Sequence, residues 1–323
     1  MTTEAEFEDQ IECAAAALRA GRLVAFPTET VFGLGADATN ASALRRLYAA
    51  KGRPADHPVI VHLGEGVDLA EWATEVPEAA RVLADAFWPG PLTLVLRAAA
   101  RVSRVATGGL ETVGLRVPAH PVAIALLAAF GGGIAAPSAN RFGRVSSTTA
   151  EAARREFGSE VETVLDGACA VGIESTIVDC TVDELRVLRP GAITVEQIGD
   201  LLGVRPELGG ATRAPGTLAT HYAPDARVEI VAAGELDARI RALTDADVTF
   251  GVIAFASEHR SVGLTNSVTL ATPASVEEYA NVLYSTLRKA DDLGMDVVLA
   301  VAPPAEGLGV AVMDRLGRAA AGR

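Results

Sequence analysis

The sequence predicts two α/β domains of unequal size, and three observations lead to that fold class. The chain has 323 residues, of which 50% are hydrophobic, enough to bury two cores of ordinary domain size. Apolar runs of strand length alternate with amphipathic runs of helix length, as in a sheet covered by helices. This alternation stops over residues 203–226, where Gly and Pro recur without a period. We therefore expect a domain at 1–202, a linker at 203–226 and a smaller domain at 227–323.

The elements of the first domain are predicted from the hydrophobic period and from capping residues. Residues 4–20 form an amphipathic helix that Gly21 ends, and Asn40 is a favourable N-cap for a helix over 41–50. The segment 33–37 (GLGAD) is interpreted as a small-residue turn. Strands are expected at 23–26, 58–63, 91–97, 113–118, 134–136, 161–165, 175–179 and 184–189, and further helices at 78–87, 120–130 and near 194–202.

The second domain is predicted to be a Rossmann-like unit. Its first strand is not followed by G-x-G-x-x-G, so the dinucleotide-binding fingerprint is absent. Strands are expected at 227–232, 248–254, 267–270 and 296–301, and helices at 234–243, 275–293 and 307–319.

The charge of the chain argues against a protein that grips nucleic acid through its phosphates. The formal net charge is −13, and neither predicted domain has the basic excess of such proteins. Of the 28 basic residues only Lys51 and Lys289 are Lys. Lys carries a compact point charge and Arg a planar fork, so the two are not interchangeable beside a phosphate. The lysine at 51, in a polar loop, is therefore an unusual choice for this chain.

Location and metal binding are predicted largely from what the sequence lacks. The N-terminal segment MTTEAEFEDQIE is acidic where a signal peptide is basic and then apolar, and no run of about 18 apolar residues is free of polar breaks. We expect a cytoplasmic protein without a membrane span. The three cysteines have no C-x-x-C pairing and are interpreted as small buried hydrophobic residues. The five histidines show no ligand spacing, so no protein metal site is predicted.

Polar side chains follow several predicted strands of the first domain. In open α/β sheets, sites lie beyond the carboxyl ends of strands, so we expect these side chains to converge on one cationic cleft. Few carboxylates are among them, which favours an anionic ligand of phosphate or carboxylate type. The residues are Thr28, Glu29, Thr30, His62, Arg116, Ser138, Asn140, Arg141 and Arg189, and the loop before the strand at 58–63 adds Lys51, Arg53 and His57.

Each of these residues also has a purely structural interpretation. Lys51 and Arg53 follow a predicted helix, where a cation is favourable in any case. Ser138 and Asn140 are common turn formers. The chain has no G-x-S-x-G and no Cys–His pair in a suitable local context, so a hydrolase triad has no support.

Taken together, the motifs resemble the YrdC-like family in its longer, two-domain form. The linker's APG at 214–216 and HYAP at 221–224 resemble the segment that joins the domains in that form, whereas Phe32 stands where the family usually has Tyr. The matching motifs are PTETVFGLG at 27–35, KGRP at 51–54, HPVIVH at 57–62, PGPLT at 89–93, GLRVP at 114–118, PSAN at 137–140, STIVD at 175–179 and RPG at 189–191.

The resemblance implies a YrdC-like twisted-sheet domain with L-threonylcarbamoyladenylate synthase activity. Such an enzyme makes threonylcarbamoyl-AMP and pyrophosphate from L-threonine, bicarbonate or CO2, and ATP, with Mg²⁺ accompanying ATP. Its product passes to a tRNA threonylcarbamoyl transferase complex that modifies adenosine 37 of tRNA. The reaction asks mainly for positioning and charge neutralisation, which a cleft rich in Lys, Arg, Ser and Thr can supply.

The resemblance also implies a role for each matching residue. Tyr222, with His221, is expected to close over the site as a lid that excludes water. The expected catalytic residues are Lys51 and Arg53. Those expected to bind threonine are Thr30, His62, Arg116, Ala136 and Thr176. Those expected to bind ATP are Arg53, His57, Thr112, Ser138, Asn140, Ser146, Arg189 and Tyr222.

Two other functions remain open at this point. An RNA-binding or ribosome-maturation module could use the same cationic cleft, and contact with double-stranded RNA or tRNA would follow. The acidic total and an aromatic content of only 5% count against it. A carbamoyl transferase acting on another acceptor is the third reading.

Overall fold

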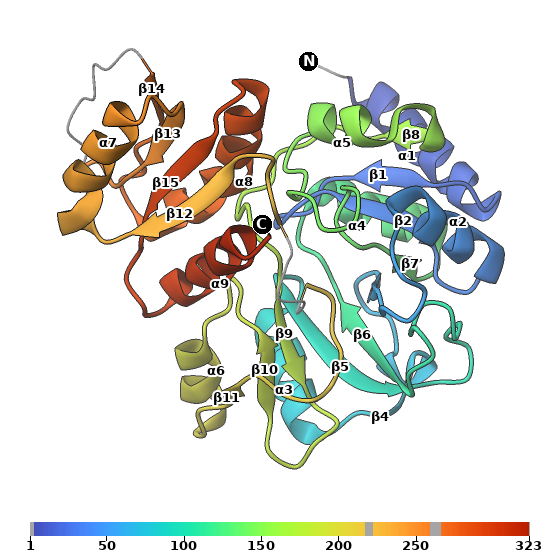
Figure 1. Cartoon of the computed structure of the whole chain (residues 1–323). Coiled ribbons are helices and arrows are strands. Elements are labelled where there is room, and N and C mark those ends of the chain that lie inside the picture. Colours follow the sequence, from blue (N-terminus) through green and yellow to red (C-terminus); the bar gives the residue numbers. More distant parts are fainter. Residues whose placement is uncertain (1–2, 217–221, 259–265, 323) are drawn as a thin grey trace. The chain divides into compact units, whose positions relative to one another are not determined.

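The computed structural model describes residues 3–216, 222–258 and 266–322, and contacts divide them into two units. Unit 1 holds the described residues up to Phe142, then Ser146–Ala170, then Glu174 to residue 216. Unit 2 holds those from 222 on, together with two short insertions from the earlier chain, Gly143–Val145 and Val171–Ile173 (Figure 1). The domain limits predicted at 202 and 227 stay predictions.

Unit 1 is built on a mixed sheet, which confirms the α/β class. In its described residues the sheet has eleven strands, in the order β11-β10-β9-β5-β6-β3-β7-β2-β1-β8, with β4 paired to β5. Parallel and antiparallel neighbours are both present. The strands are β1 Val24–Phe26, β2 Gly33–Asp37, β3 Ile60–His62, β4 Ala73–Glu75, β5 Leu92–Ala98, β6 Thr112–Arg116, β7 Ile134–Ala135, β8 Thr163–Val164, β9 Thr176–Asp179, β10 Arg186–Arg189 and β11 Glu207–Leu208.

Helices cover this sheet, and their ends follow the capping residues in the sequence. Asn40 caps α2 by accepting from the amides of Ser42 and Ala43, and Gly52 ends that helix in the left-handed conformation. One core packs α1 and α4 against β1 and β7, and a larger one lies under α2, α3, α5 and α6. The helices are α1 Glu4–Arg19, α2 Ala41–Lys51, α3 Glu78–Phe87, α4 Pro121–Phe130, α5 Ala150–Phe157 and α6 Val195–Leu202, with 3-10 turns at Leu69–Glu71 and Gly158–Glu160.

The segment GLGAD at 33–37 is a buried strand, β2, and its prediction as a turn is wrong. It pairs antiparallel with both β1 and β7. A Cβ on Gly35 would lie 2.9 Å from the Phe26 ring and 3.0 Å from Ile134, so the glycine allows close packing. Small residues are needed here because side chains of the neighbouring strands pack closely against β2. From the sequence of the segment alone, the same glycines indicate a turn. Helix α5 and strands β4 and β11 were also not predicted.

Unit 2 is a four-stranded parallel sheet with helices, as predicted for a Rossmann-like domain. Its order is β12-β15-β13-β14, and a small core lies between the sheet and α7. The elements are β12 Arg227–Val231, a 3-10 turn at Ala233–Glu235, α7 Leu236–Asp245, β13 Phe250–Ile253, β14 Ser267–Ala271, α8 Val276–Asp292, β15 Val297–Val301 and α9 Leu308–Ala320.

Two further expectations meet the structure here. Among the described helices, none is both long and apolar enough to cross a membrane. Cys169 and Cys180 are buried, and burial raises the pKa of each thiol to about 12, as suits inert small hydrophobic residues. Cys13 is exposed, so for this cysteine the buried interpretation is wrong.

Candidate functional site

Two of the predicted site residues, His62 and Arg116, are neighbours on β3 and β6. These strands run parallel, and His62 is the register partner of Arg116. Because side chains alternate along a strand, Thr112 shares the face of β6 that carries Arg116. The sheet is mixed, so Thr176 reaches this region from the start of β9, beside the start of β5. Thr176, which the family resemblance indicated, therefore lies at the start of its strand and not beyond a carboxyl end.

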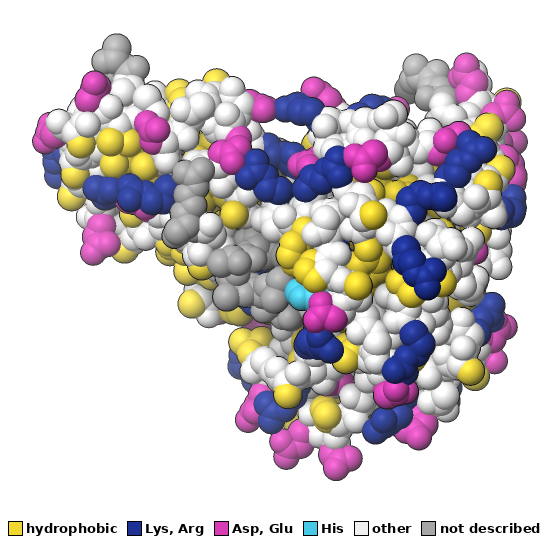
Figure 2. Space-filling view, turned by 45° about the vertical axis from the view of Figure 1, so that its right-hand side comes forward, with side chains coloured by type: hydrophobic (Ala, Val, Ile, Leu, Met, Phe, Trp, Pro, Cys, Tyr) yellow, Lys and Arg dark blue, Asp and Glu magenta, His cyan; other side chains and the backbone are white. Residues whose placement is uncertain are grey.

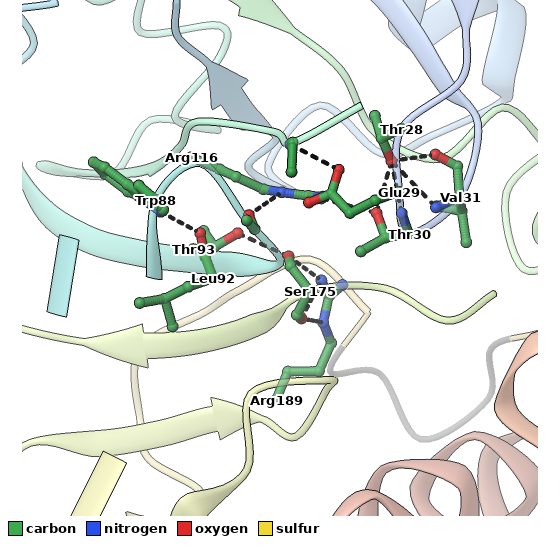
Figure 3. Close-up of polar contacts among 12 residues, drawn as sticks. Thr28, Glu29, Thr30, Val31, Trp88, Leu92, Thr93, Arg116, Ser175 and Arg189 are labelled. Carbon is green, nitrogen blue, oxygen red and sulfur yellow. Dashed lines mark hydrogen bonds and ion pairs between the residues drawn. The ribbon is translucent and has the colours of Figure 1, made fainter. Parts of the chain in front are cut away.

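Arg116 is held by three groups of the chain. Its Nε donates to the Gly90 carbonyl at 3.1 Å, its Nη1 to Thr30 Oγ1 at 2.9 Å, and its Nη2 to Glu29 Oε1 at 2.6 Å (Figure 3). The side chains of Arg116 and Glu29 are only 4% and 12% exposed. A guanidinium has five N–H donors, so two are left without a partner among the residues that the structure describes. The structure thus brings Thr30 and Arg116 together, as the sequence predicts.

Glu29 was not assigned a role by the sequence, although its position in the PTET motif could have drawn attention to it. Its Oε2 accepts from the Ala119 amide at 3.1 Å, so the carboxylate joins the turn after β1 to the start of α4. Beside it, Thr28 Oγ1 lies 2.7 Å from Thr30 Oγ1 and donates to the Val31 carbonyl. These contacts fix the turn that carries Thr30.

His62 is a buried neutral imidazole in the same cluster. Burial, and then the charge of Arg116, lower the pKa of His62 well below 6.5. Its Nδ1 is buried and has no hydrogen-bond partner among the described residues. A buried polar atom without a partner costs free energy, so a ligand group that binds it would be stabilised there.

Lys51 joins two of the predicted motifs. Its Nζ donates to the Ser138 carbonyl at 2.6 Å and also to the Asn140 carbonyl. Burial lowers the pKa of Lys51 well below 10.5, and the nearby Arg53 lowers it further. Lys51 is the last residue of α2, and its side chain reaches the PSAN segment. A cation that was only favourable at a helix end would not need these contacts.

Arg53 and His57 lie around the ring of Phe142. The Arg53 guanidinium lies over that ring at 5.8 Å, and the His57 ring meets it edge-on at 5.5 Å. Arg53 Nη2 donates to the Pro58 carbonyl at 2.7 Å. Partial burial, and then Arg53, lower the pKa of His57. The two predicted nucleotide-binding residues are therefore close together.

The PSAN segment lies beside β2 and beside the loop that carries Ser147. Leu34 N donates to the Pro137 carbonyl, and Ala139 N donates to Phe32 O. Ser147 Oγ donates to the Ala139 carbonyl at 2.5 Å. Ala136, just before the segment, is buried and donates its amide to Ile60 O.

Thr176 and Arg189 bind the chain around the ends of β9 and β10. Thr176 Oγ1 donates to the Ile193 carbonyl at 2.6 Å and accepts from its amide. Arg189 donates to the Ser175 carbonyl and to Ser175 Oγ, which lies 2.8 Å from Thr93 Oγ1 (Figure 3). Both residues are buried in unit 1.

The first half of the predicted linker packs against the sheet of unit 1. Arg189 Nη1 donates to the Pro215 carbonyl at 3.0 Å, and Arg213 forms an ion pair with Asp56 at 3.0 Å. Ala214 belongs to a small apolar cluster that includes Ile60 and residues of β5, β9 and β10. Residues 212–216 are therefore a built part of this unit.

The remaining residues of the predicted site are Thr112, Ser146 and Tyr222. Thr112 is at the opposite end of β6 from Arg116. Ser146 Oγ donates to Glu174 Oε1 at 2.6 Å. Tyr222 is 1% exposed and lies within unit 2, where its ring stacks on Tyr284 and faces the Arg315 guanidinium. His221 lies outside the described residues. The roles given to all these side chains stay predictions.

Positive charge is dispersed over the face of the molecule that Figure 2 shows. Figure 2 shows Lys and Arg side chains interspersed with Asp and Glu over the visible face, without one continuous basic tract. Among the described residues, no group of three or more His, Cys, Asp or Glu is placed to hold a metal ion. The cations of the candidate site are buried ones, such as Lys51 and Arg116.

Two family models together match nearly the whole chain. The model described as "Telomere recombination" matches residues 16–191, and the model described as "Threonylcarbamoyl-AMP synthase, C-terminal domain" matches residues 193–321. The curated threonylcarbamoyl-AMP synthase of Pyrococcus abyssi is 42% identical, covering 97% of this chain and 94% of its own. The one from Bacillus subtilis is 39% identical, covering 98% and 94%.

Solved structures agree with these matches. The crystal structure of P. abyssi Sua5 complexed with L-threonine has a TM-score of 0.91 and 40% identity, covering 98% of this chain and 95% of its own. A structure of a doubly substituted variant of P. abyssi Sua5 also has a TM-score of 0.91, with 38% identity and coverage of 100% and 97%. Both similarities extend through unit 1 and unit 2.

Proposed function

Because this chain belongs to the two-domain threonylcarbamoyl-AMP synthase family of enzymes, we propose that it converts L-threonine, bicarbonate or CO2, and ATP into threonylcarbamoyl-AMP and pyrophosphate. A tRNA threonylcarbamoyl transferase complex then consumes the product to modify adenosine 37. The RNA-binding alternative is not favoured, since the relatives are named as synthases and charges of both signs are mixed over the face in Figure 2.

One observation from the geometry carries this proposal. Thr30, His62 and Arg116 form a buried polar cluster in which Arg116 keeps two N–H donors and His62 keeps an Nδ1 without a partner among the described residues. Arg116 provides the charge and the fork geometry that bind a carboxylate. A small amino acid with a carboxylate and a side-chain hydroxyl offers groups of the right kind to this cluster, as L-threonine does.

The chemistry then needs position and charge from the chain rather than a protein nucleophile. The threonine ammonium releases two protons to water as its nitrogen bonds to the carbon of CO2, giving a carbamate. A carbamate oxygen attacks the α-phosphorus of ATP, and the bond to the pyrophosphate oxygen breaks. Lys51 and Arg53 neutralise charge on the phosphates, with Ser138, Asn140 and Arg189 placing the nucleotide.

Mg²⁺ is expected with ATP, since it neutralises the charge of the departing pyrophosphate. The described residues offer no dedicated cage of acidic and histidine ligands, so the ion would be held largely by phosphate oxygens and water. No step above depends on a protein ligand to the ion.

The test is pyrophosphate release from ATP, measured with and without L-threonine and bicarbonate. We expect release to require both, and mass spectrometry to find threonylcarbamoyl-AMP in equal amount. Release that is independent of threonine would overturn the proposal. Tight RNA binding with a steep salt dependence, and no ATP turnover, would favour the RNA-binding alternative instead.

A further inference from the structure

In the ion pair between Glu29 and Arg116, the carboxylate keeps unused acceptor positions and the guanidinium keeps unused N–H donors among the described residues. Glu29 uses one oxygen on Arg116 and the other on the Ala119 amide, while an ionised carboxylate offers about four acceptor positions. Arg116 uses three of its five N–H donors among the described residues. An anionic acceptor and a cationic donor, 2.6 Å apart and almost fully buried, therefore lie side by side.

We propose that Glu29 is a specificity-determining residue that binds the α-ammonium group of the amino acid while Arg116 binds its carboxylate. This inference rests on the proposed function, because it names the residue of that site that binds the amino group of the substrate. In an α-amino acid the ammonium and the carboxylate are separated by a single carbon atom. A closely spaced carboxylate and guanidinium match this arrangement and reject ligands that lack either charge.

Two simpler roles for Glu29 make different predictions. If Glu29 only fixes the orientation of Arg116, its loss should weaken every ligand that carries a carboxylate, with or without an amine. If Glu29 instead occupies the place of the ligand carboxylate on Arg116, its loss should tighten all such ligands. Only a direct contact with the ammonium makes the effect depend on the amine.

The proposal places the contribution of Glu29 in substrate selection. The ammonium becomes part of an anionic carbamate during the reaction, and a carboxylate does not stabilise an anion. The interaction is therefore stronger with the substrate than with the later states. Loss of Glu29 should raise KM for threonine more than it lowers kcat.

The experiment compares Glu29→Gln with the unchanged full-length chain by calorimetric binding of three probes. These are L-threonine, 3-hydroxybutanoate, which lacks the amine, and L-threoninol, which lacks the carboxylate. Glu162→Gln is the matched control, because Glu162 also pairs with an arginine of unit 1, Arg22, but with about half of each side chain exposed.

We expect Glu29→Gln to weaken L-threonine and L-threoninol by at least about 10-fold. We expect 3-hydroxybutanoate to bind within about 2-fold of its original affinity or more tightly, because a like charge has been removed. Glu162→Gln should change none of the three. Equal weakening of L-threonine and 3-hydroxybutanoate, or tightening of both, would overturn the inference.

Failure of this inference is distinguishable from failure of the proposed function. If the unchanged chain neither binds L-threonine nor releases pyrophosphate in its presence, the proposed function is wrong. If the unchanged chain does both and Glu29→Gln binds L-threonine equally well, only the role of Glu29 is wrong. A single cooperative melting transition of the variant, well above the assay temperature, keeps misfolding out of the comparison.

Discussion

Replacing Arg116 by Ala should destabilise unit 1 strongly, and the contacts of Arg116 set the size of the effect. The substitution leaves Glu29, whose side chain is 12% exposed, without its cation. It also removes the donors that reach Gly90 and Thr30. Removing one partner of a buried ion pair costs about 3–5 kcal/mol, because the remaining charge is uncompensated. Arg22→Ala, which breaks an exposed pair with Glu162, should cost about 0–1 kcal/mol.

A double substitution separates this stability effect from ligand binding. Gln at position 29 carries no charge, so Arg116→Ala with Glu29→Gln should recover about 1–3 kcal/mol relative to the sum of the single changes. Threonine binding should not recover, because both groups proposed to bind the amino acid are changed, and the lost charge-assisted partner of the carboxylate alone is worth about 2–4 kcal/mol. The double variant should therefore fold, keep its KM for ATP and show a KM for threonine raised by about 30-fold or more.

The assay is urea unfolding followed by tryptophan fluorescence. Both tryptophans of the chain, Trp72 and Trp88, belong to unit 1, so the signal reports this unit alone. The reasoning would be refuted if Arg116→Ala cost no more than Arg22→Ala, or if the single and double changes were simply additive. Equal increases of KM for ATP and threonine in the double variant would remove Arg116 from carboxylate binding.

Three further predictions concern Lys51, His62 and Tyr222. Lys51→Met should lower kcat by about 100-fold with little change in the KM for threonine, as steady-state pyrophosphate release will measure. A kcat near the original would exclude a catalytic role for Lys51 and leave it the structural role of its contacts with Ser138 and Asn140. The folded-state pKa of His62 lies well below 6.5. As the pH is lowered through 6.5, the unfolded chain therefore binds a proton that the folded chain does not, and the free energy of unfolding decreases. His62→Gln should therefore lose less stability than the original chain between pH 7.5 and pH 5.5, as urea unfolding at each pH will measure, and identical pH profiles would contradict this. Tyr222→Phe should keep the ring contacts with Tyr284 but raise the KM for ATP if the hydroxyl contacts nucleotide, whereas Tyr222→Ala should also destabilise unit 2 by about 3–5 kcal/mol; an unchanged ATP KM in Tyr222→Phe would remove Tyr222 from the nucleotide site.

Helices with clear local signals could be predicted closely from the sequence. The helix predicted at 78–87 is found at Glu78–Phe87, and Asn40 caps its helix as expected. The strand at 33–37 could not be predicted locally, because its glycines are required by Phe26 and Ile134, which come from other strands. Mixed strand direction was missed for the same reason, since the direction of a neighbour depends on long-range pairing.

The residues of the candidate site could be predicted better than their contacts could. The predicted strand ends and the family resemblance indicated Thr30 and Arg116, and the structure joins them by a hydrogen bond. Glu29 was expected near the cleft, but the sequence assigned it no role. Its pairing with Arg116 spans 87 positions of the sequence, so no local pattern reports it.

The contacts of Lys51 and Arg116 explain why these cations are suited to a site that acts by position and charge. A buried cation needs partners, and both residues obtain them from groups of their own chain. These bonds fix the side chains before any ligand binds, while one N–H of Lys51 and two of Arg116 remain unused among the described residues. Donors held in place need little reorganisation when charge develops on a phosphate or carboxylate. For this reason Lys51→Arg, which keeps the charge but cannot repeat the contacts to both Ser138 and Asn140, should not restore full turnover.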